Sequence, residues 1–211
     1  MQKLLIATTN KGKIKELSLF LQGLRIELVS LKDVGITTEV EETGATYEDN
    51  SRLKAVAYAK LSGLPALSDD GGLEIAALNG EPGVQSKYWA GPAGKDEDIL
   101  EKMKKVAKEL PDNSREARFC VVLTLALPTG KFWQVTEEIE GMIAEDASPN
   151  IPAGYPYRAF FYLPRLKKYY IDSELTLEEE KKYNHRYKAI EKLKPIIQRV
   201  LLIDKEKRGS I

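Results

Sequence analysis

The sequence predicts an α/β protein with a mixed β-sheet, and three patterns lead to that prediction. Short apolar runs alternate with segments of helical spacing in the first half of the chain. Residues 119–127 and 132–139 are typical of two hairpin strands, joined by the turn Pro128–Lys131. A long helix is predicted over residues 183–203, bent or restarted at Pro195.

The N-terminal segment predicts a strand, a polar loop and a helix. Leu4–Ala7 is a short apolar run that ends in polar residues, which is typical of a buried strand. Residues at spacings of three and four then indicate a helix: Ile14, Leu17, Phe20 and Leu21. Residues 28–31 suit a second strand.

The next helix is predicted to begin at Thr46, because Thr46 is a good N-cap and Asp49 lies three residues later. Gly63 supplies the stop. The expected apolar stripe of this helix is Leu53, Ala57 and Leu61. The remaining predicted elements are an apolar run at Pro65–Leu67 before Ser68–Gly72, a turn at Asn79–Gly80, a helix over 96–110 and a strand over 159–163.

Composition narrows the class of protein. The chain has 211 residues with 32 Lys plus Arg and 32 Asp plus Glu, so its formal net charge is zero, which argues against a nucleic-acid coat protein. The single cysteine, Cys120, excludes a disulfide framework or a cysteine-built zinc site within one chain. No apolar run approaches the ~18 residues of a membrane span, and the N-terminus lacks a cleavage signal. We expect one domain over 1–203, a flexible tail over 204–211, and a cytoplasmic location.

A polar loop, residues 8–13, lies between the first strand and the first helix. A helix start offers backbone N–H groups and partial positive charge, Gly12 allows close approach, and Lys11 or Lys13 adds a full charge. This is a phosphate cradle in principle, although the spacing is not that of a Walker A loop. The alternative is a polar turn with solvated lysines.

Two acidic stretches suit a hard cation such as Mg²⁺. The first contains Glu39, Glu41 and Glu42, and the second is Asp69-Asp70, followed by two glycines. If the run before Asp69 is a strand, its carboxylates lie at the carboxyl end, where α/β proteins bind ligands. The alternatives are a solvated acidic face and a simple Asp-Gly turn.

His185-Arg186 and the tyrosines near residue 155 are candidates for recognising a base. Arginine suits hydrogen bonds to a base edge or a phosphate, and a tyrosine face suits stacking on a purine. A solvated helix start and ordinary core packing are the alternatives for these two groups.

Together these segments resemble the Ham1/RdgB family of inosine triphosphate pyrophosphatases, also called non-canonical purine nucleoside triphosphate pyrophosphatases. The resemblance runs in order over residues 3–200 or so. The matching segments are Ala7–Leu17, Glu41–Ala55, Ser68–Gly91, Arg115–Leu127 and Asn184–Ile190.

The resemblance implies a single α/β domain of two lobes, with an elongated mixed sheet flanked by helices and a central cleft. It implies Mg²⁺-dependent hydrolysis of ITP, dITP and XTP to the monophosphate and pyrophosphate, which cleanses the nucleotide pool. A homodimer is expected, with a nucleoside triphosphate as the small-molecule partner and with no nucleic-acid polymer or membrane partner.

The resemblance also assigns roles to residues. The triphosphate would contact Thr8, Thr9, Asn10, Lys11, Gly12 and Lys13, with Asn50 and Lys54 on the next helix. Glu42 and Asp70 would bind Mg²⁺ with Asp69 as a neighbouring ligand, and Asp70 would also activate the water. The purine would contact His185, Arg186, Tyr155 and Tyr157.

Three positions depart from the family pattern. Gly71 replaces a serine at a substrate-contacting position, Arg158 replaces an aspartate, and Glu180 replaces a lysine for which the adjacent Lys181 could substitute. The residues assigned to the metal and the triphosphate are therefore retained, whereas residues assigned to recognition of the base are altered. Two alternatives follow: the same reaction on a different base, or a nucleotide-binding protein without catalysis.

Overall fold

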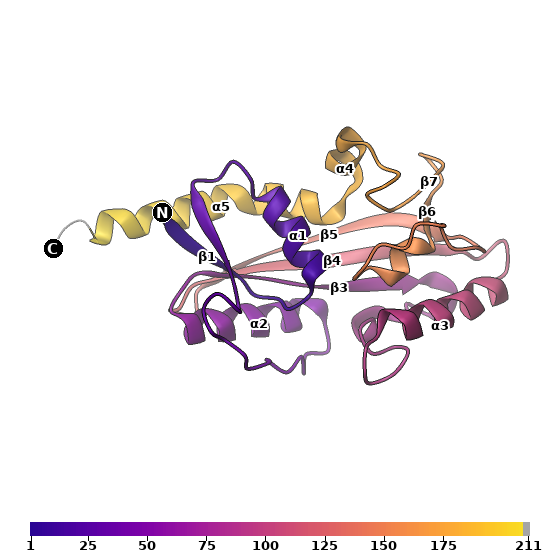
Figure 1. The fold of residues 1–211 in the computed structure, drawn as a ribbon, viewed down its shortest axis with the longest axis horizontal. Coiled ribbons are helices and arrows are strands. Elements are labelled where there is room, and N and C mark those ends of the chain that lie inside the picture. The colour runs from indigo at the N-terminus through magenta and orange to yellow at the C-terminus, as the bar shows by residue number, and fades with distance from the viewer. Residues whose placement is uncertain (209–211) are drawn as a thin grey trace. The chain divides into compact units, whose positions relative to one another are not determined.

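The computed structural model describes residues 1–208 of the chain and the side chains of residues 1–201. Strands and helices alternate along the first third of the chain (Figure 1). The strands are β1 Gln2–Ile6, β2 Ile26–Ser30, β3 Ala66–Ile75, β4 Glu116–Ala126, β5 Phe132–Ile143, β6 Phe161–Leu163 and β7 Lys168–Tyr169. The α-helices are α1 Lys11–Phe20, α2 Tyr47–Ser62, α3 Asp96–Glu109, α4 Leu177–Tyr183 and α5 His185–Arg208. Three 3₁₀ turns are Ala76–Leu78, Gly83–Gln85 and Pro156–Ala159.

Within residues 1–208, the strands form a seven-stranded sheet in the order β2-β1-β3-β4-β5-β6-β7. β1 pairs in parallel with β2 and β3, whereas β6 pairs antiparallel with β5 and β7. Parallel neighbours require a crossover connection, and the chain segments that carry α1 and α2 provide one for each parallel pair. The predicted α/β fold with a mixed sheet is confirmed.

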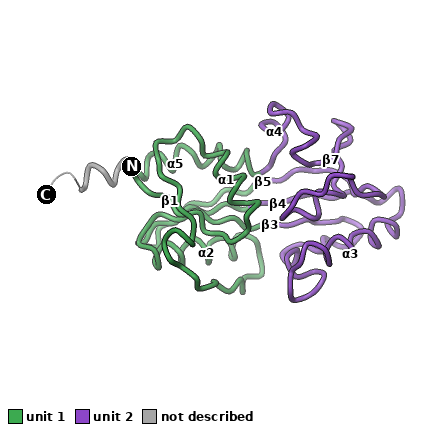
Figure 2. Tube along the Cα trace, viewed as in Figure 1, with its two compact units in different colours: residues 1–70, 122–136, 186–211 green, residues 71–121, 137–185 purple. Residues whose placement is uncertain are grey.

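The chain divides into two compact units (Figure 2). Unit 1 contains residues 1–70, 122–136 and 186–211, and unit 2 contains residues 71–121 and 137–185. Strands β3, β4 and β5 contribute residues to both units.

In unit 1, β1 is buried on both faces. Leu4, Leu5 and Ile6 are each at most 1% exposed, as expected for a parallel strand with helices on both sides. Helices α1 and α5 lie on one side of the sheet and α2 lies on the other (Figure 1). Burying each such Leu or Ile side chain stabilises the fold by about 1.5–3 kcal/mol.

In unit 2, one apolar cluster joins α3 to the sheet. Met103 of α3 belongs to the same buried cluster as Leu73 of β3, Phe161 of β6 and Tyr170. The helix is predicted correctly because its apolar residues recur on one face, with Ile99, Met103 and Leu110 buried.

The predicted helix start at Thr46 is confirmed, since the Thr46 side chain accepts a hydrogen bond from the backbone N–H of Asp49. The first helix begins at Lys11, within the segment 8–13 that is predicted as a loop, because the Asn10 side chain accepts from the backbone N–H of Lys13. Gly63 ends α2 with φ of 68°, a left-handed conformation that favours glycine.

The predicted apolar stripe of α2 is wrong. Leu53 is 39% exposed and Leu61 is 58% exposed. The buried face instead combines Ala55, Tyr58 and Ala59 with the polar side chains of Asn50, Ser51 and Lys54. These polar groups are buried because each has hydrogen-bond partners on neighbouring segments, so their desolvation is compensated.

Two helix and strand boundaries also differ from the predictions, and one helix was missed. The last helix begins at His185 rather than at residue 183, because Asn184 ends the separate helix α4. α4 was missed, although a capping box of Thr176 and Glu179 marks its start. Strand β6 begins at Phe161 because residues 156–159 form a 3₁₀ turn.

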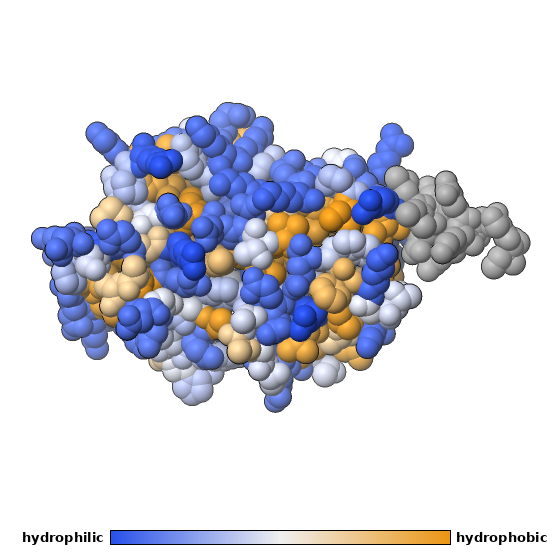
Figure 3. Space-filling view, turned by 180° about the vertical axis from the view of Figure 1, so that it is seen from behind, coloured by the Kyte–Doolittle hydropathy of each residue, from blue (hydrophilic) through white to orange (hydrophobic). Residues whose placement is uncertain are grey.

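The predicted tail lies partly within the described chain. Helix α5 continues through Pro195 and ends at Arg208, and residues 209–211 lie outside the described residues. None of the helices in the described range combines the length and the apolar character that a membrane crossing requires. The face in Figure 3 is mostly hydrophilic, with apolar patches between the charged side chains.

Candidate functional site

Strand β3 continues where its neighbour β1 stops. β1 pairs with β3 only at Leu5–Ala66 and Ile6–Leu67, so the β3 residues that follow extend past the carboxyl end of β1. Asp69 and Asp70 therefore lie inside the ten-residue strand β3, not at its carboxyl end as expected. They lie just beyond the carboxyl end of the neighbouring strand β1, and α/β proteins bind ligands at such strand ends.

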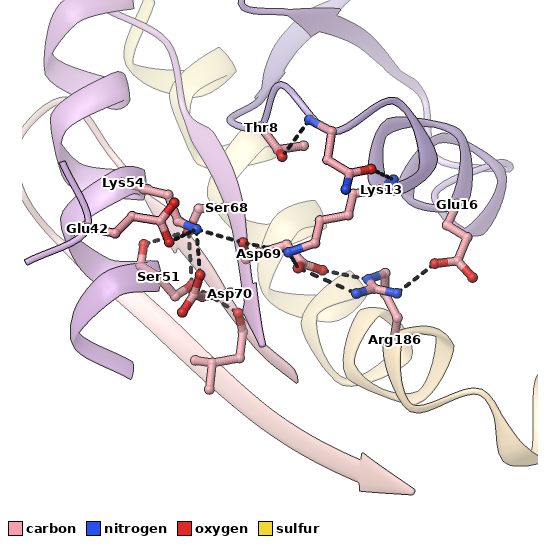
Figure 4. Close-up of polar contacts among 12 residues, drawn as sticks. Thr8, Lys13, Glu16, Glu42, Ser51, Lys54, Ser68, Asp69, Asp70 and Arg186 are labelled. Atoms are coloured by element: carbon pink, nitrogen blue, oxygen red, sulfur yellow. Dashed lines mark hydrogen bonds and ion pairs between the residues drawn. The ribbon is translucent and has the colours of Figure 1, made fainter. Parts of the chain in front are cut away.

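The pleat of β3 directs the two aspartates to opposite sides of the sheet, because successive side chains of a strand alternate. The Asp69 carboxylate points toward α1 and α5, and the Asp70 carboxylate points toward α2 (Figure 4). Adjacent residues of one motif thus have different surroundings.

Asp69 is the centre of a buried ion-pair network. Its carboxylate lies 2.5 Å from Lys13 Nζ and 2.5 Å from Arg186 Nε, and its side chain is fully buried. Arg186 NH1 also lies 2.6 Å from a carboxylate oxygen of Glu16. Burial alone would raise the pKa of Asp69, but the Arg186 and Lys13 charges hold that pKa well below its usual value. Asp69 therefore remains a carboxylate that orients two cations.

The loop before α1 is organised by its own polar side chains. Asn10 caps the helix, and its backbone N–H donates to Thr8 Oγ1 at 3.2 Å. Lys13 is partly buried and directed to Asp69, whereas Thr9 and Lys11 are exposed. The start of α1 therefore brings backbone N–H groups and two lysines together, a combination that suits an anion.

On the other face of β3, Lys54 joins two acidic residues. Lys54 Nζ donates to Asp70 Oδ1 at 2.7 Å, to Glu42 Oε2 at 3.0 Å and to the backbone oxygen of Asp69 at 3.0 Å. The Asp70 and Glu42 carboxyl groups thus share the Lys54 ammonium. The sequence-predicted pair of acidic stretches therefore comes together in unit 1.

The two carboxyl groups differ in pKa. Burial raises the pKa of Asp70 to about 7, despite the nearby Lys54 and Lys13 charges. Burial also acts to raise the pKa of Glu42, but the Lys54 charge outweighs it and lowers that pKa below the usual value. The pKa of Lys54 is raised, because Asp70 and Glu42 outweigh the effect of its burial. Of the two carboxyl groups, Asp70 is therefore the stronger base.

Asn50 holds the segment that carries Glu42. Asn50 Oδ1 accepts a hydrogen bond of 2.7 Å from the Gly44 backbone N–H, and Asn50 is 2% exposed. A Cβ on Gly44 would lie 2.7 Å from that same oxygen, so glycine permits the close approach. Asn50 thus has a positioning role in addition to any contact with a ligand.

A buried hydroxyl cluster fixes α2 against the sheet, and the sequence analysis missed it. Ser51 Oγ lies 3.0 Å from Ser68 Oγ, donates to the Val122 backbone oxygen at 2.9 Å, and accepts from Thr124 Oγ1 at 2.7 Å. These contacts connect the helix that carries Lys54 to strands β3 and β4. No local sequence signal marks the cluster, since isolated serines are common on solvent-facing helix surfaces.

The expected base-reading residues are divided between the units. Arg186 belongs to unit 1 and contacts Asp69 and Glu16, whereas His185 belongs to unit 2. His185 Nδ1 lies 2.7 Å from the Tyr170 hydroxyl, and its ring stacks on Phe119 with centroids 5.8 Å apart. Both residues are buried, at 2% and 4% exposure, so the solvated helix start is excluded for the pair.

Unit 2 holds the other predicted base contacts in different settings. Tyr157 is buried and donates its hydroxyl to the Ser86 backbone oxygen at 2.6 Å, and burial raises its pKa well above the usual value. The Arg158 guanidinium, 4% exposed, lies 4.1 Å from the centroid of the Tyr155 ring. Lys181 is exposed and pairs with Glu178 at 3.1 Å.

Gly71 cannot carry the hydroxyl that the family pattern has at this position. A Cβ built on Gly71 would lie 2.2 Å from the backbone oxygen of Cys120 on the neighbouring strand. A glycine is therefore required by this packing, and Gly71 can contact a ligand only through its backbone.

Unit 1 thus collects the helix start, Lys13, Lys54 and a carboxyl pair around one strand end. Among residues with described side chains, no group of three or more His, Cys, Asp or Glu is arranged to hold a metal ion. Mg²⁺ is commonly bound by one or two carboxylates together with substrate phosphates and water, which fits the Glu42–Asp70 pair. The fold and the site define an α/β protein with lysines and carboxyl groups gathered beside one strand end, an arrangement that suits a charged small-molecule ligand.

Comparison with known proteins names the family. The model of the Ham1 family matches residues 4–196, and the chain belongs to this family. A "dITP/XTP pyrophosphatase" of Syntrophobacter fumaroxidans is 40% identical over 199 residues, covering 94% of this chain and 83% of the relative. One of Thermus thermophilus is 41% identical over 194 residues, covering 90% and 89%. A solved Ham1 protein from Coxiella burnetii superposes with a TM-score of 0.79 at 32% identity, covering 94% of this chain and all of that one.

Proposed function

We propose that this protein hydrolyses the triphosphates ITP, dITP and XTP to the nucleoside monophosphate and pyrophosphate. The observation that carries the proposal is the meeting of Glu42, Lys54 and Asp70 at the strand end that also receives Lys13. The relatives named dITP/XTP pyrophosphatases match nearly the whole chain, which supports the same reaction here.

The proposal assigns the metal to two carboxylates, Glu42 and Asp70. Both are hard oxygen donors, and both already have one cation, Lys54, within 3.0 Å. Asp69, expected as a third ligand, has both oxygens turned toward Lys13 and Arg186, so we give it the role of orienting those cations. Bound Mg²⁺ would neutralise phosphate charge and increase the acidity of water near it.

The chain's own residues supply the remaining chemistry. The backbone N–H groups at the start of α1 and the Lys13 and Lys54 ammonium groups neutralise the triphosphate, which carries about four negative charges. Asp70, whose pKa burial raises to about 7, takes a proton from water at neutral pH. The water oxygen attacks the α-phosphorus, the bond to the bridging oxygen breaks, and pyrophosphate leaves.

A second candidate keeps this reaction and changes the base. The buried Arg158 guanidinium lies 4.1 Å from the Tyr155 ring and 4.7 Å from the Tyr170 ring, and Tyr170 contacts His185. Since Arg158 replaces the aspartate of the family pattern, a hydrogen-bond donor stands where an acceptor is expected, and a base other than hypoxanthine or xanthine is the second candidate.

We also propose a cytoplasmic homodimer without nucleic-acid or membrane partners. Balanced charge and a single cysteine support this, together with exposed apolar side chains such as Leu61 and Phe132. Size-exclusion chromatography with light scattering tests the oligomeric state.

One substrate panel tests the function. Pyrophosphate release is measured with Mg²⁺ from ITP, dITP, XTP and the four standard ribonucleoside triphosphates. Release confined to ITP, dITP and XTP supports the first proposal, and release from another base supports the second. Calorimetric binding of ITP without release from any triphosphate would contradict both and favour a binding protein.

A further inference from the structure

The Lys54 ammonium has no donor left for a phosphate in the arrangement described above. An ammonium group has three N–H donors, and those of Lys54 go to Glu42, Asp70 and the Asp69 backbone oxygen, at 2.7–3.0 Å. Its side chain is only 11% exposed. A phosphate can therefore receive a hydrogen bond from Lys54 only if the ammonium leaves at least one of these partners.

The two side-chain partners of Lys54 are the carboxylates that the proposed function assigns to the metal. A cation bound by Glu42 and Asp70 would lie beside the ammonium that now donates to one oxygen of each, and its charge would repel that ammonium. Simultaneous binding of the Lys54 ammonium and a divalent cation by the two carboxylates is thus disfavoured. Either the lysine or the metal neutralises Glu42 and Asp70.

Helix α2 itself is held in place while the lysine side chain can move. Ser51, three residues before Lys54, contacts Ser68 and the Val122 backbone oxygen, both within 3.0 Å. The flexible part is the lysine's four-carbon stem, which moves the charge without moving the helix.

We propose that Lys54 is a resident counter-ion of the metal site. It bridges Glu42 and Asp70 in the metal-free protein, and it transfers to the triphosphate when a divalent cation takes the two carboxylates. This inference rests on the proposed function. Since the triphosphate gives the displaced ammonium a new anionic partner, metal and nucleotide each strengthen the binding of the other.

The test measures metal binding directly, without nucleotide and without turnover. Mn²⁺ affinity is determined by electron paramagnetic resonance for the wild-type chain, Lys54→Met, Lys54→Arg and the control Lys60→Met, which removes an exposed charge from the same helix. We expect Lys54→Met to bind Mn²⁺ about tenfold or more tightly than the wild type, since a competing charge is gone. Lys54→Arg and Lys60→Met should each stay within about twofold of the wild type.

A second measurement addresses the coupling. With a non-hydrolysable α,β-methylene analogue of ITP, the wild type should bind Mn²⁺ about tenfold more tightly than without it, and Lys54→Met should lose most of that gain. Equal or weaker Mn²⁺ binding by folded Lys54→Met without nucleotide would overturn the proposal. Circular dichroism verifies folding, and Lys54→Gln replaces Lys54→Met if the latter does not fold.

The two proposals fail separately. Tighter Mn²⁺ binding by Lys54→Met, with no pyrophosphate release from any triphosphate by the wild type, would leave the counter-ion role intact and refute the hydrolase. Pyrophosphate release with unchanged Mn²⁺ affinity in Lys54→Met would do the reverse.

Discussion

The neighbouring aspartates of β3 predict opposite effects on stability for the same substitution. Asp69→Asn removes a fully buried carboxylate whose oxygens lie 2.5 Å from Lys13 Nζ and from Arg186 Nε. The two cations then lose their shared counter-ion, and breaking a buried ion pair in this way costs about 3–5 kcal/mol. At about 2–4 °C per kcal/mol for a chain of this size, Tm should fall by about 6–20 °C.

Asp70→Asn should have the opposite sign in the metal-free protein. Burial raises the pKa of Asp70 from 3.8 to about 7, so ionisation of Asp70 disfavours the folded state. This loss of stability is absent below about pH 4, grows as pH rises, and is complete above about pH 7. Asparagine is neutral throughout, so the variant should gain up to about 4 kcal/mol at pH 8, the equivalent of about three pKa units.

The assay is urea unfolding with EDTA at pH 4 and pH 8, followed by circular dichroism. The control is Asp112→Asn, whose exposed carboxylate lies 3.6 Å from Arg115 Nε and should contribute less than about 1 kcal/mol. If Asp70→Asn lost as much stability at pH 8 as Asp69→Asn, the assignment of the two faces of β3 would be refuted. A gain for Asp70→Asn that is equal at both pH values would refute the pKa argument.

Three other substitutions test the surroundings of the site. Gly71→Ser should lower stability by about 1–3 kcal/mol in urea unfolding, because its Cβ would lie 2.2 Å from the Cys120 backbone oxygen, and an unchanged midpoint would contradict this. Asn50→Ala removes the oxygen that accepts a hydrogen bond of 2.7 Å from the Gly44 N–H, which loosens the segment that carries Glu42. The Mg²⁺ concentration for half-maximal pyrophosphate release should then rise several-fold, and an unchanged value would exclude the positioning role. Tyr157→Phe loses a hydrogen bond of 2.6 Å and should lower the free energy of unfolding by about 1 kcal/mol, and the same stability as the wild type would show that the bond contributes nothing.

Local signals were sufficient for the elements that obey local rules. Thr46 marks a helix start because its side chain satisfies a backbone N–H group three residues later. The first strand, predicted at Leu4–Ala7 and observed at Gln2–Ile6, was predictable because both of its faces are buried and a continuous apolar run results. The candidate site was predictable in part because Lys13 follows the first strand and Asp69 and Asp70 follow a second apolar run.

Long-range partners explain the errors. The buried face of α2 was predicted from apolar spacing, yet it holds Ser51 and Lys54 because their partners Val122 and Asp70 lie 71 and 16 residues away. β3 was expected to end before its aspartates because Asp and Gly are depleted in strands. Glu16 was overlooked, although it lies one helical turn after Lys13, because its partner Arg186 is 170 residues distant.

The alternation of Asp69 and Asp70 has a consequence for how this segment tolerates change. Inserting or deleting one residue between Leu67 and Asp69 would turn each carboxylate to the opposite layer of helices, away from the lysine that now contacts it. A single substitution alters the ion pairs of one aspartate, whereas a one-residue shift of strand register breaks the ion pairs of both aspartates together. Any redesign of the protein that keeps these ion pairs must therefore preserve the length of this short stretch, and changes of length belong in the connections outside β3.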